Sequence, residues 1–561
     1  MPVARIPLVI GYNSRKDAAT TVIANKDQLL KNCMFKVGVN PVTNESFASI
    51  EKRIGFTLDS AFNPISGTGN GSLVFTTNRT GTNPNRTFVC KGTTSTVNGS
   101  SHGELGTVDS GTINHATETI QDGESYVIFV ANDGTAYYHA QSMGSVTSFT
   151  GTTTNGSNVI TSVSSTTGLY VGQPISGTGI PVSAKINSID SATQITMLGN
   201  ATASGSITIT VTRLAKIIDS DFLTLTSPSN RASGRMVFMD GYAFVITNKG
   251  EIHNSALNDF TSWSASDYLN ANEVTDQGTT LARYKNLIAA FGEKSIEFFQ
   301  NAGSPFGSPL ARLNGSTVKI GASSAINVIE SEDTIYWVGT SDTRYSGVFR
   351  LNGLQPEKIS SPIVDELIQS AALTSVRISS AQVASAHLIF VDLASTILLV
   401  FDTNTGIWSE WTTPTGEGAF VNAIYSSGDL AVYALFKSAT RLHRLLFQDT
   451  TYVDKSSAAA NLTYSAIAQT QRHTHGTNNR KFVNSVSLVS DKQSSGTATL
   501  EYSDDDYGSW TTAGTFDLTT MNPRIHRCGS FVGGRAWRLT HSASTAFRAD
   551  ALEIDLDIGV H

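Results

Sequence analysis

The sequence of 561 residues contains few charged side chains and few cysteines. Charged residues make up 15% of the chain, against roughly a quarter in ordinary globular proteins. The formal net charge is -7, which argues against a protein that grips nucleic-acid phosphates, since such proteins need a basic patch. Hydrophobic residues still make up 40% of the chain, so disorder is excluded. The length predicts about two to four domains.

Cysteine chemistry and membrane insertion are also disfavoured. Cys33, Cys90 and Cys528 are too few and too far apart for a disulfide framework or a zinc site, so we expect buried thiols. The apolar run near the N-terminus is too short for a signal peptide, and no run approaches the ~20 apolar residues of a membrane span. We therefore expect a chain that is made and folded in the cytosol.

What the sequence does contain is a repeat of strand, turn and answering strand. One clear unit is the hairpin at residues 287–299, with its turn at Gly292. Successive units are roughly 44 to 53 residues apart, which is the span of a four-stranded propeller blade. The sequence therefore predicts an all-β protein with a β-propeller of six or seven blades. Phe298 and Trp337 are expected in the cores of adjacent blades.

One interval in the repeat is about twice too long, which indicates an insertion. Residues 145–211 hold only two charged side chains, Lys185 and Asp190, and alternate as short strands. They predict a small β module, which is either a plain structural insertion or a module with a specific interaction role. Its segment GLYVGQPISGTGIP is similar to small modules found in many phage tail and fibre proteins.

The C-terminal part predicts a separate β domain, because its strands alternate between apolar and polar residues as in a sandwich. We refer to this domain as the platform. The predicted division is an N-terminal segment that joins the platform (1–56), the first blades (57–144), the inserted module (145–212), the remaining blades (213–454) and the C-terminal domain (455–561).

The segment SDDDYGSW at residues 503–510 is similar to the Asp-box turn of sialidase propellers, but it lacks one residue before the tryptophan. Such a box is itself a structural hairpin turn, because the Asp side chain caps it. No nucleophile, phosphate-binding or metalloprotease motif is present in the sequence. We therefore predict a protein that is not an enzyme, without catalytic or cofactor-binding residues and without a cofactor.

Two histidines are the only candidate metal ligands. His473 and His475 would share one face of a strand, and such pairs bind iron or zinc when symmetry brings three copies together. Their loop, QRHTHGTNNRK, contains no carboxylate or cysteine. We expect a solvated loop and no metal.

Four arginines form a local basic cluster in the C-terminal domain: Arg524, Arg527, Arg535 and Arg538. Three interpretations are open: an interface with a neighbouring subunit or adaptor, a solvated strand face, or a DNA contact. We favour the interface, because arginine makes bidentate contacts to carboxylates and because a phosphate track would carry cations continuously.

The order of parts in residues 287–324 resembles the core of the tail hub, or nozzle, proteins of short-tailed double-stranded DNA phages, also called packaged-DNA stabilisation proteins. That order is a strand ending in FG, the segment IEFF, a loop rich in Gly and Pro, and a strand with KIGA. KRIG at residues 52–55 also matches a turn of that family, although alone it suggests a surface turn. GVFRLNGLQPEKIS, LLVFDTNTGIWSEW and the Arg-rich strands extend the resemblance.

The resemblance implies a structural virion protein of the tail, assembled in the host cytoplasm. It implies a homohexameric ring that docks on a head-to-tail adaptor and contacts tail spikes or fibres and a tail needle or plug. Such a ring retains packaged DNA and conducts it without sequence specificity, and an acidic lumen would let DNA slide. The alternative is a propeller that binds a receptor or processes glycans, with exposed aromatics and carboxylates at one mouth.

Overall fold

The computed structural model describes residues 3–8, 29–39, 46–59, 71–77, 85–91, 96–99, 103–108, 113–143, 146–304, 306–341, 346–383, 386–426, 431–446 and 451–559. Its regular structure is nearly all β, as predicted, with short α-helices at Ser220–Thr224 (α1) and Pro362–Ser370 (α2). Within these residues, no helix has the length and apolar character needed to cross a membrane.

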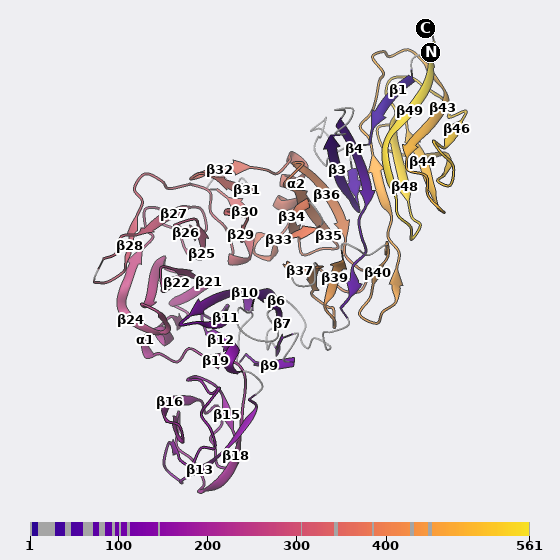
Figure 1. Ribbon diagram of the computed structural model, residues 1–561. Helices are drawn as coiled ribbons and strands as arrows, with labels where there is room; N and C mark the ends of the chain where they lie inside the picture. The colour runs from indigo at the N-terminus through magenta and orange to yellow at the C-terminus, as the bar shows by residue number, and fades with distance from the viewer. Residues whose placement is uncertain are drawn as a thin grey trace.

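The main body is a ring of β-sheets (Figure 1). Among the described residues, seven sheets follow in chain order, and we call each a blade. The first three are β6–β9 (Gly71–Thr77, Asn85–Lys91, Thr96–Gly99, Gly103–Thr107), then β10–β12 with β19 (Ile113–Gln121, Glu124–Ala131, Ala136–Ala140, Ala215–Lys216), then β20–β24 (Thr226–Ser227, Asn230–Met239, Tyr242–Thr247, Glu251–Ala256, Asp259–Asn270). The next two are β25–β28 (Gly278–Tyr284, Leu287–Gly292, Ile296–Asn301, Leu310–Arg312) and β29–β32 (Val328–Ser331, Thr334–Thr340, Ser346–Asn352, Gln355–Lys358). The last two are β33–β36 (Arg377–Val383, Ala386–Asp392, Ile397–Asp402, Ile407–Thr412) and β37–β39 (Phe420–Ser426, Ala431–Phe436, His443–Leu446) with β5 (Thr57–Leu58).

The ring is closed in two ways. One strand of each blade contacts its counterpart in the next blade, in the order β6, β10, β21, β25, β29, β33, β37, and β37 contacts β6 again. In addition, the outer strand of the last blade comes from the N-terminal part of the chain, because β5 pairs with β39 through His443 and Leu58. The last blade therefore contains a strand from the N-terminal part of the chain, and this pairing closes the ring.

Neighbouring blades pack face to face, so both faces of a central strand are buried and its sequence is a continuous apolar run. The predicted hairpin of residues 287–299 is present as β26 and β27. Phe298 and Trp337 are both 0% exposed and belong to one core between two blades, as the sequence predicted. The Trp337 ring stacks on Phe349 and meets the edge of Phe291.

The inserted segment forms two small sheets with a core of their own. The chain leaves the second blade after β12 and returns at β19, and the segment between them projects below the ring in Figure 1. Its sheets are β13, β18 and β15 (Ser148–Thr153, Gly205–Val211, Ile175–Ser176) and β14, β17 and β16 (Val159–Ile160, Gln194–Met197, Ile186–Ser191). The exact boundaries of the domains stay a prediction.

The platform is a sandwich of two sheets that both contain N-terminal strands. One sheet contains β1, β3, β4, β43, β46, β47 and β49 (Val3–Pro7, Cys33–Val39, Ser46–Lys52, Lys481–Ser490, Arg524–His526, Ser530–Phe531, Arg548–Ile558). The other contains β2, β42, β48, β44 and β45 (Leu29–Lys31, Ala466–Gln469, Ala536–His541, Thr497–Ser503, Thr511–Asp517). The second sheet continues into the propeller, because β2 pairs in parallel with β36 through Lys31 and Glu410.

Candidate functional site: the platform and its junction with the propeller

The candidate residues from the sequence lie mainly at the end of the platform away from the propeller, which we call the platform tip. The tip consists of residues 471–480, 503–510 and 527–535 and lies beside the end of β49, where Lys481 pairs with Ile558 (Figure 1). The buried thiols expected from the sequence are present, since Cys33, Cys90 and Cys528 are all free and buried.

Arg535 is the buried centre of the platform tip. Its side chain is 0% exposed and makes a bidentate ion pair with Asp504, with both N–O distances 2.7 Å. A further N–H donates to the carbonyl of Cys528 at 2.6 Å, and the guanidinium lies 3.8 Å from the ring centre of Tyr502. The prediction that Arg535 contacts a neighbouring protein is therefore wrong, because its donors are used inside the platform.

The other three arginines do not form one patch with Arg535. Arg538 is half-buried on β48, where it pairs with Glu501 at 2.7 Å and lies 4.2 Å from the Trp510 ring centre. Arg524 and Arg527 are exposed on and after β46, which belongs to the other sheet. The exposed members of the cluster are Arg524, which donates to the Ser487 hydroxyl at 2.8 Å, and Arg527, and an interface role for them stays a prediction.

The two histidines are half-buried, whereas the sequence suggested a solvated loop. The N–H of His473 donates to the carbonyl of Arg535 at 2.9 Å, which ties the loop to the tip. Burial, with a smaller contribution from His475, lowers the pKa of His473 to about 4. The ring of His475 contacts that of Phe531. No group of three or more His, Cys, Asp and Glu suited to a metal ion occurs in the described part of the chain.

The segment similar to an Asp box is the turn between β44 and β45. Asp505 accepts hydrogen bonds from the N–H of Ser509 at 2.9 Å, from its hydroxyl at 2.6 Å and from the hydroxyl of Ser503 at 2.8 Å. These bonds, those from Ser509 first, lower the pKa of Asp505 to about 2. The carboxylate thus caps its own turn, as the structural interpretation of this segment predicted.

A second group of buried polar residues holds the platform on the propeller, and sequence reasoning missed it. Arg53 is 0% exposed and pairs with Asp454 through two bonds of 2.8 and 2.7 Å. It also donates to the side chain of Asn32 at 3.1 Å and to the Thr412 carbonyl of β36 at 3.1 Å. The interpretation of residues 52–55 as a surface turn is therefore wrong.

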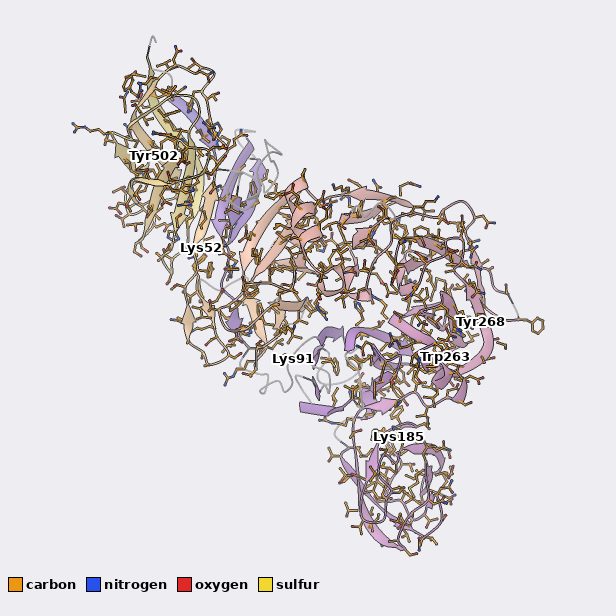
Figure 2. All side chains as sticks on the ribbon, turned by 180° about the vertical axis from the view of Figure 1, so that it is seen from behind. Lys52, Lys91, Lys185, Trp263, Tyr268 and Tyr502 are labelled. Atoms are coloured by element: carbon orange, nitrogen blue, oxygen red, sulfur yellow. The ribbon has the colours of Figure 1, made fainter. Side chains whose placement is uncertain are left out.

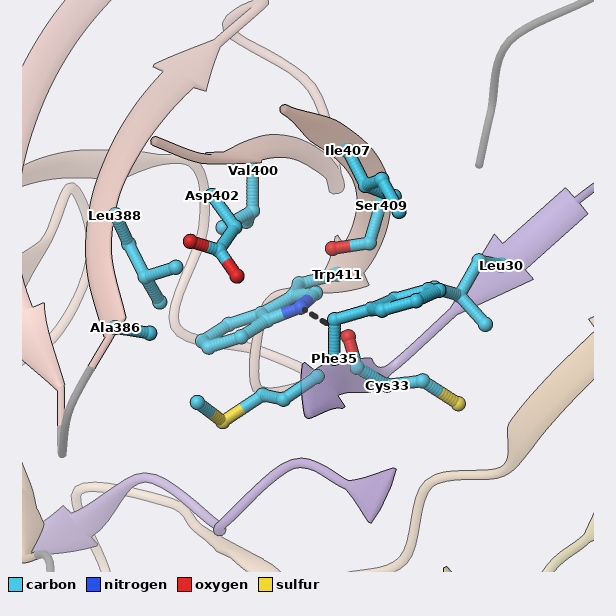
Figure 3. Close-up of a pocket in the computed structure, with 11 residues that line it drawn as sticks. Leu30, Cys33, Phe35, Ala386, Leu388, Val400, Asp402, Ile407, Ser409 and Trp411 are labelled. Atoms are coloured by element: carbon cyan, nitrogen blue, oxygen red, sulfur yellow. Dashed lines mark hydrogen bonds between the residues drawn. The ribbon is translucent and has the colours of Figure 1, made fainter. Parts of the chain in front are cut away.

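Asn32 and Trp411 complete this junction. The Oδ1 atom of Asn32 accepts from Arg53 and from the N–H of Thr412 at 2.9 Å. In Figure 3, the indole of Trp411 lies between the blade residue Leu388 and the platform residue Phe35, and its N–H donates to the Cys33 carbonyl at 3.3 Å. Platform and blade therefore share a continuous sheet, a buried ion pair and a buried tryptophan.

The sequence contained a weak signal for the junction. KRIG at residues 52–55 matches a turn of the resembled family, but Asp454, the ion-pair partner of Arg53, is 401 positions away. Gly55 is required at this place, since a Cβ there would lie 1.9 Å from the Val453 carbonyl oxygen. The sequence does not reveal these two contacts, of Arg53 with Asp454 and of Gly55 with Val453, because they form only when the two distant segments pack together.

A 3-10 turn at Ala325–Asn327 lies among the inner strands of the propeller. This buried turn contacts β10, β21 and β33, which lie on different sides of the ring. His115 of β10 hydrogen-bonds to the Ala325 carbonyl at 2.7 Å, and the Asn327 amide donates to the Val376 carbonyl at 2.7 Å. The propeller axis is thus packed with protein at this level.

The family comparison concerns part of the inserted module and the propeller blades that follow it. Residues 175–426, less than half of the chain, match the family model described as Phage_stabilise, bacteriophage P22 Gp10, beta-propeller. No curated protein matches the chain in sequence. Among solved structures, BamB from Moraxella catarrhalis is similar with a TM-score of 0.32 and 11% identity, over 71% of this chain and 98% of that chain, a score too low to support an argument. The propeller of this chain is thus similar to a phage stabilisation family, which supports a structural protein of a phage tail.

Proposed function

We propose that the protein is the tail nozzle, or hub, of a short-tailed phage, which closes the tail tube, retains packaged DNA and conducts it during ejection. The observation that carries this proposal is the match of residues 175–426 to the P22 Gp10 propeller family. The motif order in residues 287–324, which lies within the matched range, supports the same proposal.

In this proposal the DNA lumen lies between copies of the chain. The turn at Ala325–Asn327 packs against strands around the propeller axis, so a duplex would not pass through a single subunit. Copies arranged in a homohexamer would instead enclose a shared channel, as heterologous contacts allow when rotation closes the ring. The net charge of -7 suits such a channel, because an acidic wall repels phosphate and lets DNA slide without sequence specificity.

The proposed partners are other tail proteins: the head-to-tail adaptor, tail spikes or fibres, and a tail needle or plug. Arg524 and Arg527 are the exposed arginines available for such contacts, since Arg535 is enclosed and Arg538 is paired with Glu501. Bidentate arginine contacts would set orientation and register more than total affinity.

Electron microscopy of the purified chain tests this proposal. A closed ring with a lumen wide enough for duplex DNA is the expected result, either alone or after mixing with the adaptor. In phage particles that lack the protein, we expect the heads to be filled with DNA at first and then to lose it. A monomer that never forms rings and binds host-surface glycans would contradict the nozzle and favour the receptor-binding alternative.

A further inference from the structure

A charged cleft opens on the platform close to the junction. Its volume is about 480 Å³, and its walls come from β3, β4, the loop after β43 and the loop before β49. Figure 2 places Lys52 at the end of the platform that faces the propeller. The charged side chains that line the cleft are Lys36, Glu51, Lys52, Asp491, Lys492 and Arg548.

The cations of the cleft outnumber its anions. Lys36 pairs with Glu51 at 2.9 Å, and Arg548 pairs with Asp491 at 3.3 Å. Lys52 and Lys492 have no carboxylate within ion-pair distance among the described residues. The charged side chains that line the cleft are therefore four cations and two anions, an excess of two positive charges.

Lys52 is the unusual member of this set. It is 3% exposed, and its ammonium donates to the backbone carbonyls of Tyr464 at 3.0 Å and Ala543 at 2.7 Å. The ammonium also lies 4.5 Å from the ring centre of Tyr464, a cation–π contact, so no carboxylate is among its close partners in the described residues. A buried cation without a carboxylate at ion-pair distance is costly, and burial lowers the pKa of Lys52 to about 8, although the more distant Asp454 partly opposes this shift. A bound anion would supply the missing counter-charge.

We propose that this cleft binds the carboxylate side chain of an acidic segment from a partner protein. A short acidic segment with one or two carboxylates suits the excess of two positive charges and the size of the cleft. A DNA duplex does not, because its closely spaced phosphates would meet Glu51 and Asp491 at the same walls. The site goes beyond the proposed tail function and does not rest on it, since binding is measured on the isolated chain.

The charge state of Lys52 gives this site a pH dependence. Binding needs the ammonium form, so it should weaken as the pH rises from 7 through about 8 to 9. Of the groups near Lys52, Cys33 has a pKa raised by burial to about 12 and His541 has a pKa lowered by burial to about 4, so neither titrates in this window. The other charged or titratable groups around Lys52 and in the cleft walls are Arg53, Asp454, Tyr464, Tyr452, Lys36, Glu51, Asp491, Lys492 and Arg548.

Calorimetric titration of the full chain tests the proposal with the peptide acetyl-Gly-Glu-Glu-Gly-amide. The comparison ligands are the matched Gln peptide and inorganic phosphate. We expect saturable binding of one Glu peptide per chain, no binding of the Gln peptide, and binding up to about tenfold weaker at pH 9 than at pH 7, because the protonated fraction of a group with a pKa of about 8 falls by that factor.

Variants connect the binding to the cleft. Lys52→Met removes the ammonium but keeps the apolar stem, and Lys492→Gln changes an exposed residue. Each should weaken Glu-peptide binding at least fivefold, whereas Lys249→Gln, an exposed lysine of the propeller, should leave it unchanged. If Lys52→Met does not fold, the affinity of Lys492→Glu for the Glu peptide is measured instead.

The proposal is overturned if the wild-type chain does not bind the Glu peptide or binds the Gln peptide equally. It is also overturned if Lys492→Glu retains wild-type affinity. Phosphate binding as tight as that of the Glu peptide would show a general oxyanion site and contradict the assignment to an acidic protein segment.

Discussion

In the propeller, neighbouring blades meet through aromatic and aliphatic side chains such as Phe298 and Trp337. In the platform and at its junction, two enclosed arginines, Arg53 and Arg535, are each paired with an aspartate and surrounded by rings. The apolar packing between neighbouring blades is repeated around the propeller, and many weak contacts stabilise each interface. Each of these two ion pairs instead depends on a single aspartate. The comparison suggests that the propeller tolerates small changes in its cores, whereas the junction is sensitive to the loss of a single carboxylate.

Lowering the pH should produce the largest loss of stability, because it acts on both the propeller and the platform. His541 of the platform is buried and His115 of the propeller is half-buried, and desolvation lowers the pKa values of both, that of His541 to about 4. The unfolded chain takes up these protons near pH 6.5 while the folded chain does not, so stability is retained above 6.5 and lost as the pH falls toward 4. Each such group contributes roughly 1.4 kcal/mol per pH unit in this window.

Thermal unfolding between pH 7 and 4.5 measures this loss. His541→Phe should flatten the pH dependence of the platform transition while leaving that of the propeller unchanged. Equal slopes for the variant and the wild type would show that His541 does not carry the effect.

The substitution Asp454→Ala should produce the second-largest loss of stability. It leaves the Arg53 guanidinium buried without its counter-charge and also removes the acceptor of the Phe56 N–H, which lies 2.9 Å from Asp454. Breaking such a pair costs about 3–5 kcal/mol. Denaturant unfolding measures the loss, and the double variant Arg53→Met with Asp454→Leu should recover a large part of it. A loss below about 1 kcal/mol in Asp454→Ala would contradict the proposed sensitivity of the junction.

Trp337→Ala should cost about 3 kcal/mol, because it empties a fully buried site between two blades. The matched variant Trp337→Phe keeps most of the contacts with Phe291 and Phe349 and should cost less. Unfolding of the purified variants gives both numbers. An unchanged midpoint for the alanine variant would contradict the packing of these two blades.

Arg524→Glu with Arg527→Glu should have the smallest effect on stability, within about 0.5 kcal/mol, because both side chains are exposed. If these residues form the proposed interface, the double variant remains folded but fails to complete tails. Arg535→Glu serves as the contrasting variant, because it places an acid beside Asp504 in the buried tip and should unfold the platform. Normal tail completion by the double variant would leave Arg524 and Arg527 as solvated surface residues.

The sequence by itself determined the β-class, the blade hairpins and the presence of an insertion. These features follow from local patterns: apolar runs such as residues 287–291 are bounded by turn residues, and they recur at the interval of a blade. The interval that was too long between the second and third blades indicated inserted residues. The core positions of Phe298 and Trp337 followed from the same pattern and are confirmed.

Only the tertiary structure decided which strand closes the ring, how β2 joins a blade to the platform, and which arginines are buried. Arg524 and Arg535 belong to the same Arg-rich segment, and no local pattern distinguishes them. Arg524 is nevertheless exposed, whereas Arg535 is enclosed by Tyr502, Phe531 and Asp504. Arg53 and Asp454 meet across 401 positions. The physical reason is that strand pairing and the burial of a charge depend on which distant segments pack together, and local residue patterns carry no record of that choice.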